Sequence, residues 1–210
     1  MQNDIYKFEL QRKIFHLCSL IFPVLYAFTP KMFMSIFLLV ITVFTIYIDT
    51  SKHYNNKIKG FVGKYFAKYL RGKEKIGSFT LSGASYMAVG FFITCLFFSK
   101  GLAITSWLIL IISDAIAALV GIKYGKSFIS HHNNKTLAGS IAFFVSGMFI
   151  SIVSYFFFVY QTSFLIIFFS SAAATLTEFY SSSIKIDDNL SIPVVYCLST
   201  VFLILISKIL

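Results

Sequence analysis

The chain contains seven long apolar runs, and their length limits the folds available to it. They cover residues 14–29, 32–48, 79–98, 102–122, 137–159, 163–180 and 192–208. The hydrocarbon core of a bilayer is ~30 Å thick, and an α-helix of about 20 apolar residues crosses it. The runs are continuous rather than alternating, which favours helices over a β-barrel. The sequence therefore predicts an all-α polytopic integral membrane helix bundle, with about seven transmembrane helices in a single domain over 1–210.

Composition supports this prediction. Hydrophobic residues make up 58% of the chain and charged residues 12%, whereas soluble domains are about half apolar and about a quarter charged. Cys18, Cys95 and Cys197 lie far apart inside apolar runs. Their spacing fits neither a metal site nor a disulfide framework, so we interpret them as buried apolar residues.

The basic residues indicate an orientation. With the N-terminus in the cytoplasm, fifteen of the eighteen Lys and Arg residues fall in cytoplasmic segments, as the positive-inside rule requires. A basic cytoplasmic loop at about 49–78 suits contact with anionic headgroups or, alternatively, recruitment of a nucleotide. The net charge of +10 is thus interpreted as topology and lipid contact, not nucleic-acid binding. The expected location is a bacterial inner membrane.

The acidic residues gather on the same side. All eight face the cytoplasm or lie in the cytoplasmic half of a helix under this topology: Asp4, Glu9, Asp49, Glu74, Asp114, Glu178, Asp187 and Asp188. Asp114 lies inside the run 102–122. A carboxylate there costs roughly 2.5–3.5 kcal/mol on insertion scales, which marks it as a functional residue.

A first polar group precedes the first apolar run. Glu9, Arg12, Lys13 and His16 have spacings that place them on one helical face. Arg12 offers a planar fork for a carboxylate or phosphate, which Lys does not. The alternative is an interfacial anchor in which Glu9 pairs with Lys13.

Small residues follow Asp114 on one helical stripe. Gly121 and Gly125 allow a second helix, or a phosphate, to approach the backbone closely. A carboxylate at this depth needs a cation, and nucleotide-bound Mg²⁺ is a natural candidate. The alternatives are a packing stripe with Asp114 paired to Arg12, or an ion-pathway carboxylate.

Two further groups stand at predicted helix ends. Lys135-Thr136-Leu-Ala-Gly139-Ser140 opens the fifth helix, where free N–H groups attract anions; the alternative is N-capping by Thr136. Glu178, Asp188 and Asn189 come from the last two helices. They supply oxygen ligands for a divalent metal or, alternatively, cap helices.

These strings occur together in one known family. In order they are Glu9…Arg12-Lys13…His16, Ser82-Gly83-Ala-Ser-Tyr86, Ser113-Asp114-Ala-Ile-Ala-Ala-Leu-Val-Gly121…Gly125-Lys126, Lys135-Thr136-Leu-Ala-Gly139-Ser140, Glu178, and Asp188-Asn189-Leu-Ser-Ile-Pro193. The ordered set resembles the CTP-dependent polyprenol (dolichol), phytol and diacylglycerol kinase family, a distant relative of the phosphatidate cytidylyltransferases. The resemblance implies a membrane lipid kinase that transfers the γ-phosphate of CTP, or another nucleoside triphosphate, to a lipid alcohol.

The resemblance also implies residue roles. Asp114, with Asp188 or Glu178, would bind Mg²⁺, and Arg12 or His16 would stabilise the transferred charge or orient the acceptor hydroxyl. Asp188, Glu178 and His16 are the candidates for the general base. The residues expected to bind the nucleotide and its phosphates are Lys126, Lys135, Thr136, Gly139, Ser140, Gly121, Gly125 and Asn189.

Two alternatives to a kinase are kept. One is cytidylyltransferase-like synthesis of a CDP-lipid, although the long C-terminal signature of those enzymes is absent from this chain. The other is a small transporter or flippase that uses Asp114 and Glu178 as an ion relay. A relay predicts polar residues through the whole membrane depth, whereas the outer half of every predicted helix is nearly uncharged.

Overall fold

The structure is a computed structural model. It describes residues 13, 14, 16–55, 58, 60, 81–125, 135–158, 162–184 and 186–209. Most of the predicted basic loop lies outside the described residues. Three predicted site residues or partners, Glu9, Arg12 and Lys126, also lie outside them.

The described residues are mostly helical. Residues 13, 14, 16 and 17 are helical and lead into a 3₁₀ turn, Cys18–Leu20. The elements that follow are α2 (Ile21–Phe28), α3 (Lys31–Tyr54), α5 (Gly83–Phe97), α6 (Lys100–Leu108), a π-helical turn (Ile109–Ser113), α7 (Asp114–Tyr124), α8 (Leu137–Phe158), α9 (Phe164–Ile184) and α10 (Asp188–Ile209).

Five stretches of the described chain are helical, long and apolar enough to cross a membrane, which fits a helical membrane bundle. They are Lys31–Lys52, Lys100–Tyr124, Leu137–Phe158, Phe164–Ser181 and Asp188–Ile209. Two other predicted spans correspond to shorter apolar helices, Cys18–Phe28 and Gly83–Phe97. The predicted count of seven is therefore not confirmed. Two predicted starts also shift, since α5 begins at Gly83 rather than 79 and α10 at Asp188 rather than 192.

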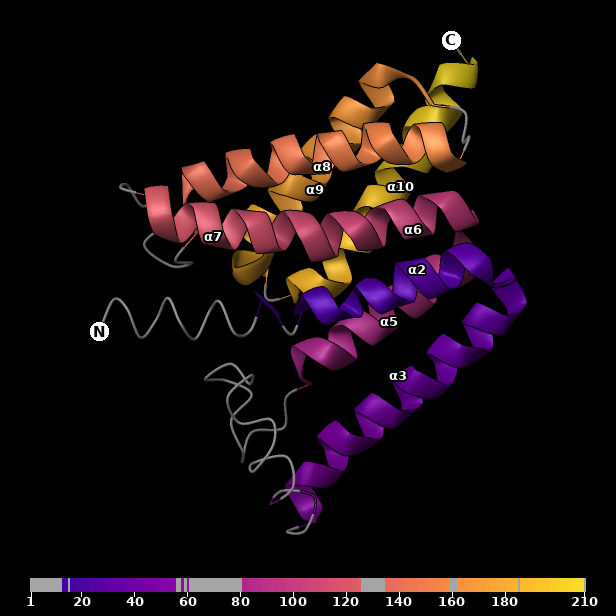
Figure 1. Cartoon of the computed structure of the whole chain (residues 1–210), viewed down its shortest axis with the longest axis vertical. Coiled ribbons are helices and arrows are strands. Elements are labelled where there is room, and N and C mark those ends of the chain that lie inside the picture. Colours follow the sequence, from indigo (N-terminus) through magenta and orange to yellow (C-terminus); the bar gives the residue numbers. More distant parts are fainter. Residues whose placement is uncertain are drawn as a thin grey trace.

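The central element of the bundle is the continuous rod formed by α6, the π-helical turn and α7. Figure 1 shows this rod running beside α8, with α2 and α5 next to it and α9 and α10 behind. Helix α10 packs against both α9 and α5, and α3 packs against α5. In Figure 1, α3 diverges from the other helices along its length.

Aromatic rings hold α2, α5 and α6 together. The Trp107 ring stacks between Tyr26 and Phe91, with centroid distances of 5.3 and 4.5 Å. Its indole Nε1 donates a hydrogen bond to Thr94 Oγ1 at 2.7 Å. Because lipid is as apolar as these side chains, close packing and interhelical hydrogen bonds stabilise such an interface.

Two lysines join the turn after α2 to the turn after α5. Lys31, the first residue of α3, donates from Nζ to the Phe98 carbonyl at 2.8 Å. Lys100, the first residue of α6, donates to the carbonyls of Ala27 and Thr29 at 2.9 and 3.0 Å. Each cation thus binds carbonyls at the end of a helix, where the backbone carries partial negative charge.

Candidate active site

Asp114 lies deep in the rod, directly after the π-helical turn. Its side chain is buried, with 8% of the residue exposed. It precedes the last residue of α7, Tyr124, by ten positions, or roughly 15 Å along a helix axis. A π-helical turn adds a residue to one turn of a helix and is frequent at functional sites. The prediction that Asp114 occupies a special position inside an apolar helix therefore agrees with its local structure.

Two side chains from the N-terminal helix reach Asp114. Lys13 donates a hydrogen bond from Nζ to Asp114 Oδ2. His16 Nε2 lies 3.8 Å from the same oxygen and 3.5 Å from the Leu110 carbonyl in the π-helical turn. Lys13 is itself 6% exposed, so it is a buried partner of Asp114 and not a surface anchor.

The sequence places Lys13 on a polar helical face or, alternatively, in an interfacial anchor paired with Glu9, and it does not predict the pairing with Asp114. The available signal was the spacing of three residues between Lys13 and His16, which places both on one helical face. Arg12, the residue favoured as the cation of this group, lies outside the described residues.

Lys135 joins the ends of α9 and α10. Its Nζ lies 2.6 Å from Glu178 Oε1 and 3.5 Å from Asp188 Oδ2. It also donates to Ser181 Oγ at 3.3 Å. Two of the predicted carboxylates, on two different helices, are thus bound by Lys135, one of the two lysines expected to bind phosphate.

The side chains around Asp114 and those around Lys135 interact electrostatically and form one unit. Burial lowers the pKa of Lys135, but the carboxylates of Asp188, Glu178 and, more weakly, Asp114 outweigh it and raise this pKa above its ordinary value. His16 also interacts electrostatically with both Asp114 and Asp188. We refer to this unit as the carboxylate–lysine cluster, whose members are Lys13, His16, Asp114, Lys135, Glu178 and Asp188.

The donor chemistry of the cluster suits Mg²⁺, although no three-residue metal site exists in the described part of the chain. No group of three His, Cys, Asp or Glu side chains there is arranged to hold a metal ion. Mg²⁺ commonly needs only one or two protein carboxylates, because phosphates and water supply its other oxygens. Asp114 and Asp188 offer such oxygens, each next to a lysine that balances its charge.

Residues at the start of α8 connect it to the cluster. Thr136 Oγ1 accepts a hydrogen bond from the Gly139 amide at 3.1 Å, so Thr136 caps the helix, one of the two roles considered from the sequence. Ser140 Oγ donates to Glu178 Oε2 at 3.5 Å. Lys135 is the residue before this cap, so the cap fixes the backbone next to the lysine of the cluster.

The predicted glycine stripe brings α7 and α8 into close contact. A Cβ on Gly121 would lie 2.8 Å from Thr136 Oγ1, and one on Gly139 would lie 2.9 Å from the Ala117 carbonyl. A Cβ on Gly125 would lie 2.4 Å from Thr136 Cγ2. Their neighbours in the structure are thus backbone and side chain of the helix hairpin. Their contact with a phosphate stays a prediction.

Asp187, which the sequence-based site did not include, organises the first turn of α10. Its Oδ1 accepts hydrogen bonds from the backbone amide of Asn189 at 3.0 Å and from Asn189 Nδ2 at 2.7 Å. Asn189 is buried. The predicted capping role at this end therefore belongs to Asp187, while Asp188 points to Lys135.

A second buried carboxylate, Asp49, lies on α3. Its Oδ2 accepts hydrogen bonds from the Ser82 amide and hydroxyl at 2.7 and 2.8 Å and from the Ser85 hydroxyl at 2.6 Å. Its Oδ1 accepts from Lys52 Nζ at 2.9 Å. These contacts attach the C-terminal part of α3 to the first turn of α5.

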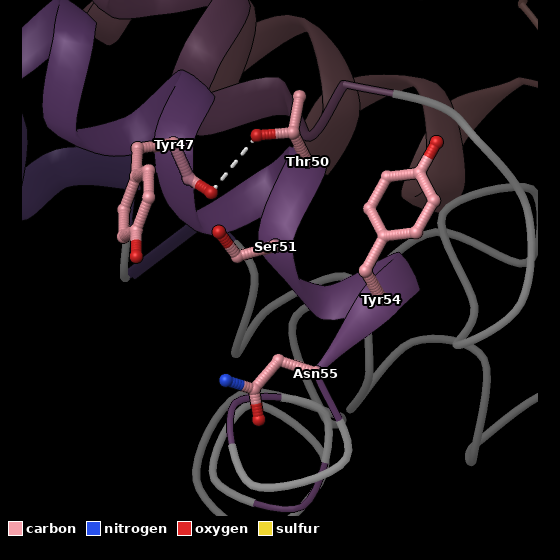
Figure 2. Close-up of a pocket in the computed structure, with 5 residues that line it drawn as sticks. All are labelled: Tyr47, Thr50, Ser51, Tyr54 and Asn55. Atoms are coloured by element: carbon pink, nitrogen blue, oxygen red, sulfur yellow. Dashed lines mark hydrogen bonds between the residues drawn. The ribbon is translucent and has the colours of Figure 1, made fainter.

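An open surface hollow is found at the C-terminal end of α3. Figure 2 shows its lining, which consists of Tyr47, Thr50, Ser51, Tyr54 and Asn55. Thr50 Oγ1 donates to the Tyr47 carbonyl at 3.0 Å, which occupies its hydroxyl. None of these lining side chains is charged, so the hollow does not offer the cations that a polyphosphate requires.

The chain belongs to the same family as a bacterial protein of similar length. It is 52% identical over 200 residues to "Uncharacterized protein RP860" of Rickettsia prowazekii (strain Madrid E), covering 95% of this chain and 97% of that protein. It is 38% identical over 76 residues to "CTP-dependent diacylglycerol kinase 1" of Saccharomyces cerevisiae, covering 36% of this chain and 26% of the yeast protein. The chain thus spans about a quarter of the yeast enzyme. No family model and no solved structure matches it.

Proposed function

We propose that this protein is a membrane lipid kinase that transfers the γ-phosphate of CTP, or of another nucleoside triphosphate, to the hydroxyl of a lipid alcohol. Candidate acceptors are a polyprenol, phytol or diacylglycerol. In this proposal the carboxylate–lysine cluster is the active site and faces the cytoplasm, from which the nucleotide enters. The acceptor stays in the bilayer and approaches the cluster between helices.

One observation carries the proposal. Lys135 contacts carboxylates of α9 and α10. It also interacts electrostatically with Asp114 of α7, which Lys13 binds from the N-terminal helical residues. Phosphoryl transfer needs little covalent chemistry from a protein, but it needs cations and metal-binding oxygens in one place. The partial similarity to a CTP-dependent diacylglycerol kinase supports the same class of reaction.

The residues divide into roles that follow from their charge. Asp114 and Asp188 would hold a Mg²⁺ ion, which when bound offsets the charge of the phosphates. Lys135 would bind phosphate oxygens, exchanging its contact with Asp188 for them. Arg12, Lys126 and the other predicted phosphate-binding residues keep the roles that the resemblance implies.

The reaction balances without a further reactant. The acceptor hydroxyl oxygen forms a bond to the γ-phosphorus, and the bond from that phosphorus to the β,γ-bridging oxygen breaks. The nucleoside diphosphate leaves, and the hydroxyl proton passes to a base. Asp188, Glu178 and His16 are the members of the cluster able to accept it, and His16 is the one that also contacts the π-helical turn.

The proposal is tested with the full chain reconstituted in lipid nanodiscs with Mg²⁺, a panel of lipid alcohols and, in separate reactions, phosphatidate as the lipid phosphate that CDP-lipid synthesis would require. CTP and ATP are each supplied in two forms, labelled at the α- or at the γ-phosphate. We expect label from the γ-form in one lipid. Label from the α-form in a lipid would indicate CDP-lipid synthesis instead, and no labelled lipid from a folded protein would overturn the proposal.

Asp49→Asn provides a matched control for Asp114→Asn. Both residues are buried carboxylates paired with a lysine, with 7% and 8% of their surface exposed. We expect Asp114→Asn to abolish labelling and Asp49→Asn to retain it. Equal loss in both variants, at equal folded fractions, would contradict the assignment of the active site.

A further inference from the structure

The first turn of α10 is fixed from within and from outside. From within, Asp187 Oδ1 accepts hydrogen bonds from the amide and from the side chain of Asn189. The Ser191 hydroxyl donates to the Asp187 carbonyl at 3.1 Å. From outside, α5 approaches so closely that a Cβ on Gly90 would lie 3.0 Å from the Asn189 carbonyl oxygen.

This turn carries two residues of the proposed active site. Asp188 lies 3.5 Å from the Lys135 ammonium group, and Asn189 is buried beside it. The Asn189 amide has two ends, and Asp187 binds the NH₂ end. Asp187 therefore sets the orientation of the Asn189 side-chain amide, and with it the direction in which the side-chain oxygen Oδ1 points.

We propose that Asp187 is a positioning residue, which orients the Asn189 amide and holds Asp188 in register with Lys135, and that Gly90 supports the same turn from α5. This inference rests on the proposed function. It assigns different tasks to two adjacent aspartates, because Asp187 acts through its neighbours whereas Asp188 itself contacts the phosphate-binding lysine.

The chain offers variants that separate positioning from simple stability. Asp187→Ala removes the acceptor, whereas Asp187→Asn keeps an Oδ1 acceptor and a side chain that caps helices well. Since a misplacement of about 1 Å in an active site can cost about a hundredfold in rate, we expect Asp187→Ala to lower kcat at least about tenfold. Asp187→Asn should stay within about threefold of wild type.

A glycine pair gives a second, independent test. Gly90→Ala places a methyl group 3.2 Å from Leu190 Cα, so the first turn of α10 has to shift. Gly147→Ala, on α8, places one 3.7 Å from its nearest neighbours, which is an ordinary contact. We expect a lower kcat for Gly90→Ala with the KM for nucleotide nearly unchanged, and wild-type kinetics for Gly147→Ala.

A readout that does not depend on activity separates this inference from the proposed function. In protein with isotope-labelled asparagine, the side-chain NH₂ resonance of Asn189 is assigned by its loss in Asn189→Gln. We expect it to shift in Asp187→Ala and to stay in place in Asp187→Asn. If the wild-type protein has no kinase activity, the proposed function is overturned but this inference is not. The Asn189 resonance would still report whether Asp187 positions the Asn189 amide.

Three results would overturn the inference itself. The first is an unchanged Asn189 resonance in Asp187→Ala. The second is Asp187→Ala activity equal to that of Asp187→Asn, and the third is Gly90→Ala kinetics equal to those of Gly147→Ala. Loss of folded protein in Asp187→Ala alone leaves the glycine pair to decide.

Discussion

Asp49 and Asp114 are both buried carboxylates with a lysine partner, yet their remaining contacts differ in kind. Asp49 Oδ2 is bound by a backbone amide and two serine hydroxyls of one neighbouring helix turn. Asp114 Oδ2 is contacted by Lys13 and, at a longer distance, by His16. Short neutral donors on fixed backbone lock a helix in place, whereas the flexible ammonium of a lysine can be exchanged for another cation.

The kind of donor that a buried carboxylate binds can therefore distinguish a structural carboxylate from a functional one when their burial and charge are alike. At Asp49, the donors other than Lys52 come from Ser82 and Ser85 at the start of α5 and are part of the scaffold. At Asp114, the partners are ionisable side chains from a distant part of the sequence, and Asp188 and Lys135 lie in the same electrostatic unit. The five predictions below test this distinction.

The largest effect is expected for Asp114→Asn. Asparagine preserves the shape of the side chain but removes the charge that would hold a metal and that pairs with Lys13. We expect lipid phosphorylation to fall by about 10²–10³-fold, with helical content by circular dichroism unchanged. Activity within a few-fold of wild type would remove Asp114 from the active site.

Lys135→Met should have the next largest effect. It leaves Glu178 and Asp188 facing each other without their shared cation, so we expect the KM for nucleotide to rise at least about tenfold. Lys135→Arg should recover part of the loss. A KM equal to that of wild type would show that Lys135 serves the scaffold instead.

The same residue predicts a pH dependence. Because its carboxylate neighbours raise the pKa of Lys135 above the ordinary value, the ammonium group stays charged through neutral and mildly alkaline pH. Nucleotide affinity should therefore not weaken between about pH 7 and 9. A KM that rises with an apparent pKa inside this range, and that loses this rise in Lys135→Arg, would contradict the sign of the shift.

Asp49→Ala should lower stability and leave activity nearly unchanged, which is the opposite of the result expected for Asp114→Asn. It removes the acceptor shared by Ser82, Ser85 and Lys52, and breaking a buried pair costs about 3–5 kcal/mol. We expect a clear fall in the thermal unfolding temperature in detergent, with the specific activity of the remaining folded protein within a few-fold of wild type. A stable but inactive variant would place Asp49 in the site.

Ser85→Ala gives the smallest effect. It removes one of the three hydrogen bonds to Asp49 Oδ2 and leaves the two from Ser82 in place. We expect a loss of about 1 kcal/mol in the free energy of unfolding and no change in kcat or KM. A fall in kcat/KM with no loss in the free energy of unfolding would contradict the structural role of Asp49 and its distinction from Asp114.

The sequence allowed the helical class to be predicted, because apolar length is a local signal. It also singled out Glu178 and Asp188, which the structure places on Lys135. The pairing of Lys13 with Asp114 could not be predicted in the same way, because these residues are 101 positions apart in the sequence. That contact depends on the relative depth and rotation of two helices, and on a π-helical turn that no residue preference marks.

The roles of Asp187 and Asp188 illustrate the same limit on a smaller scale. A cap is defined by where its helix begins, and the predicted start of the last helix lies four positions after the observed one. With α10 beginning at Asp188, the preceding aspartate becomes the cap. Local patterns thus singled out Asp188 but not the capping contacts of Asp187.

The reciprocal lysine contacts at the two short turns bear on biogenesis. Lys31 belongs to the hairpin α2–α3 but binds a carbonyl at the end of α5, and Lys100 belongs to the hairpin α5–α6 but binds carbonyls at the end of α2. During synthesis the first hairpin emerges before its carbonyl partner exists. Lys31 therefore gains this carbonyl partner only after the second hairpin has been inserted alongside the first, so both lysine contacts form after the two hairpins have met.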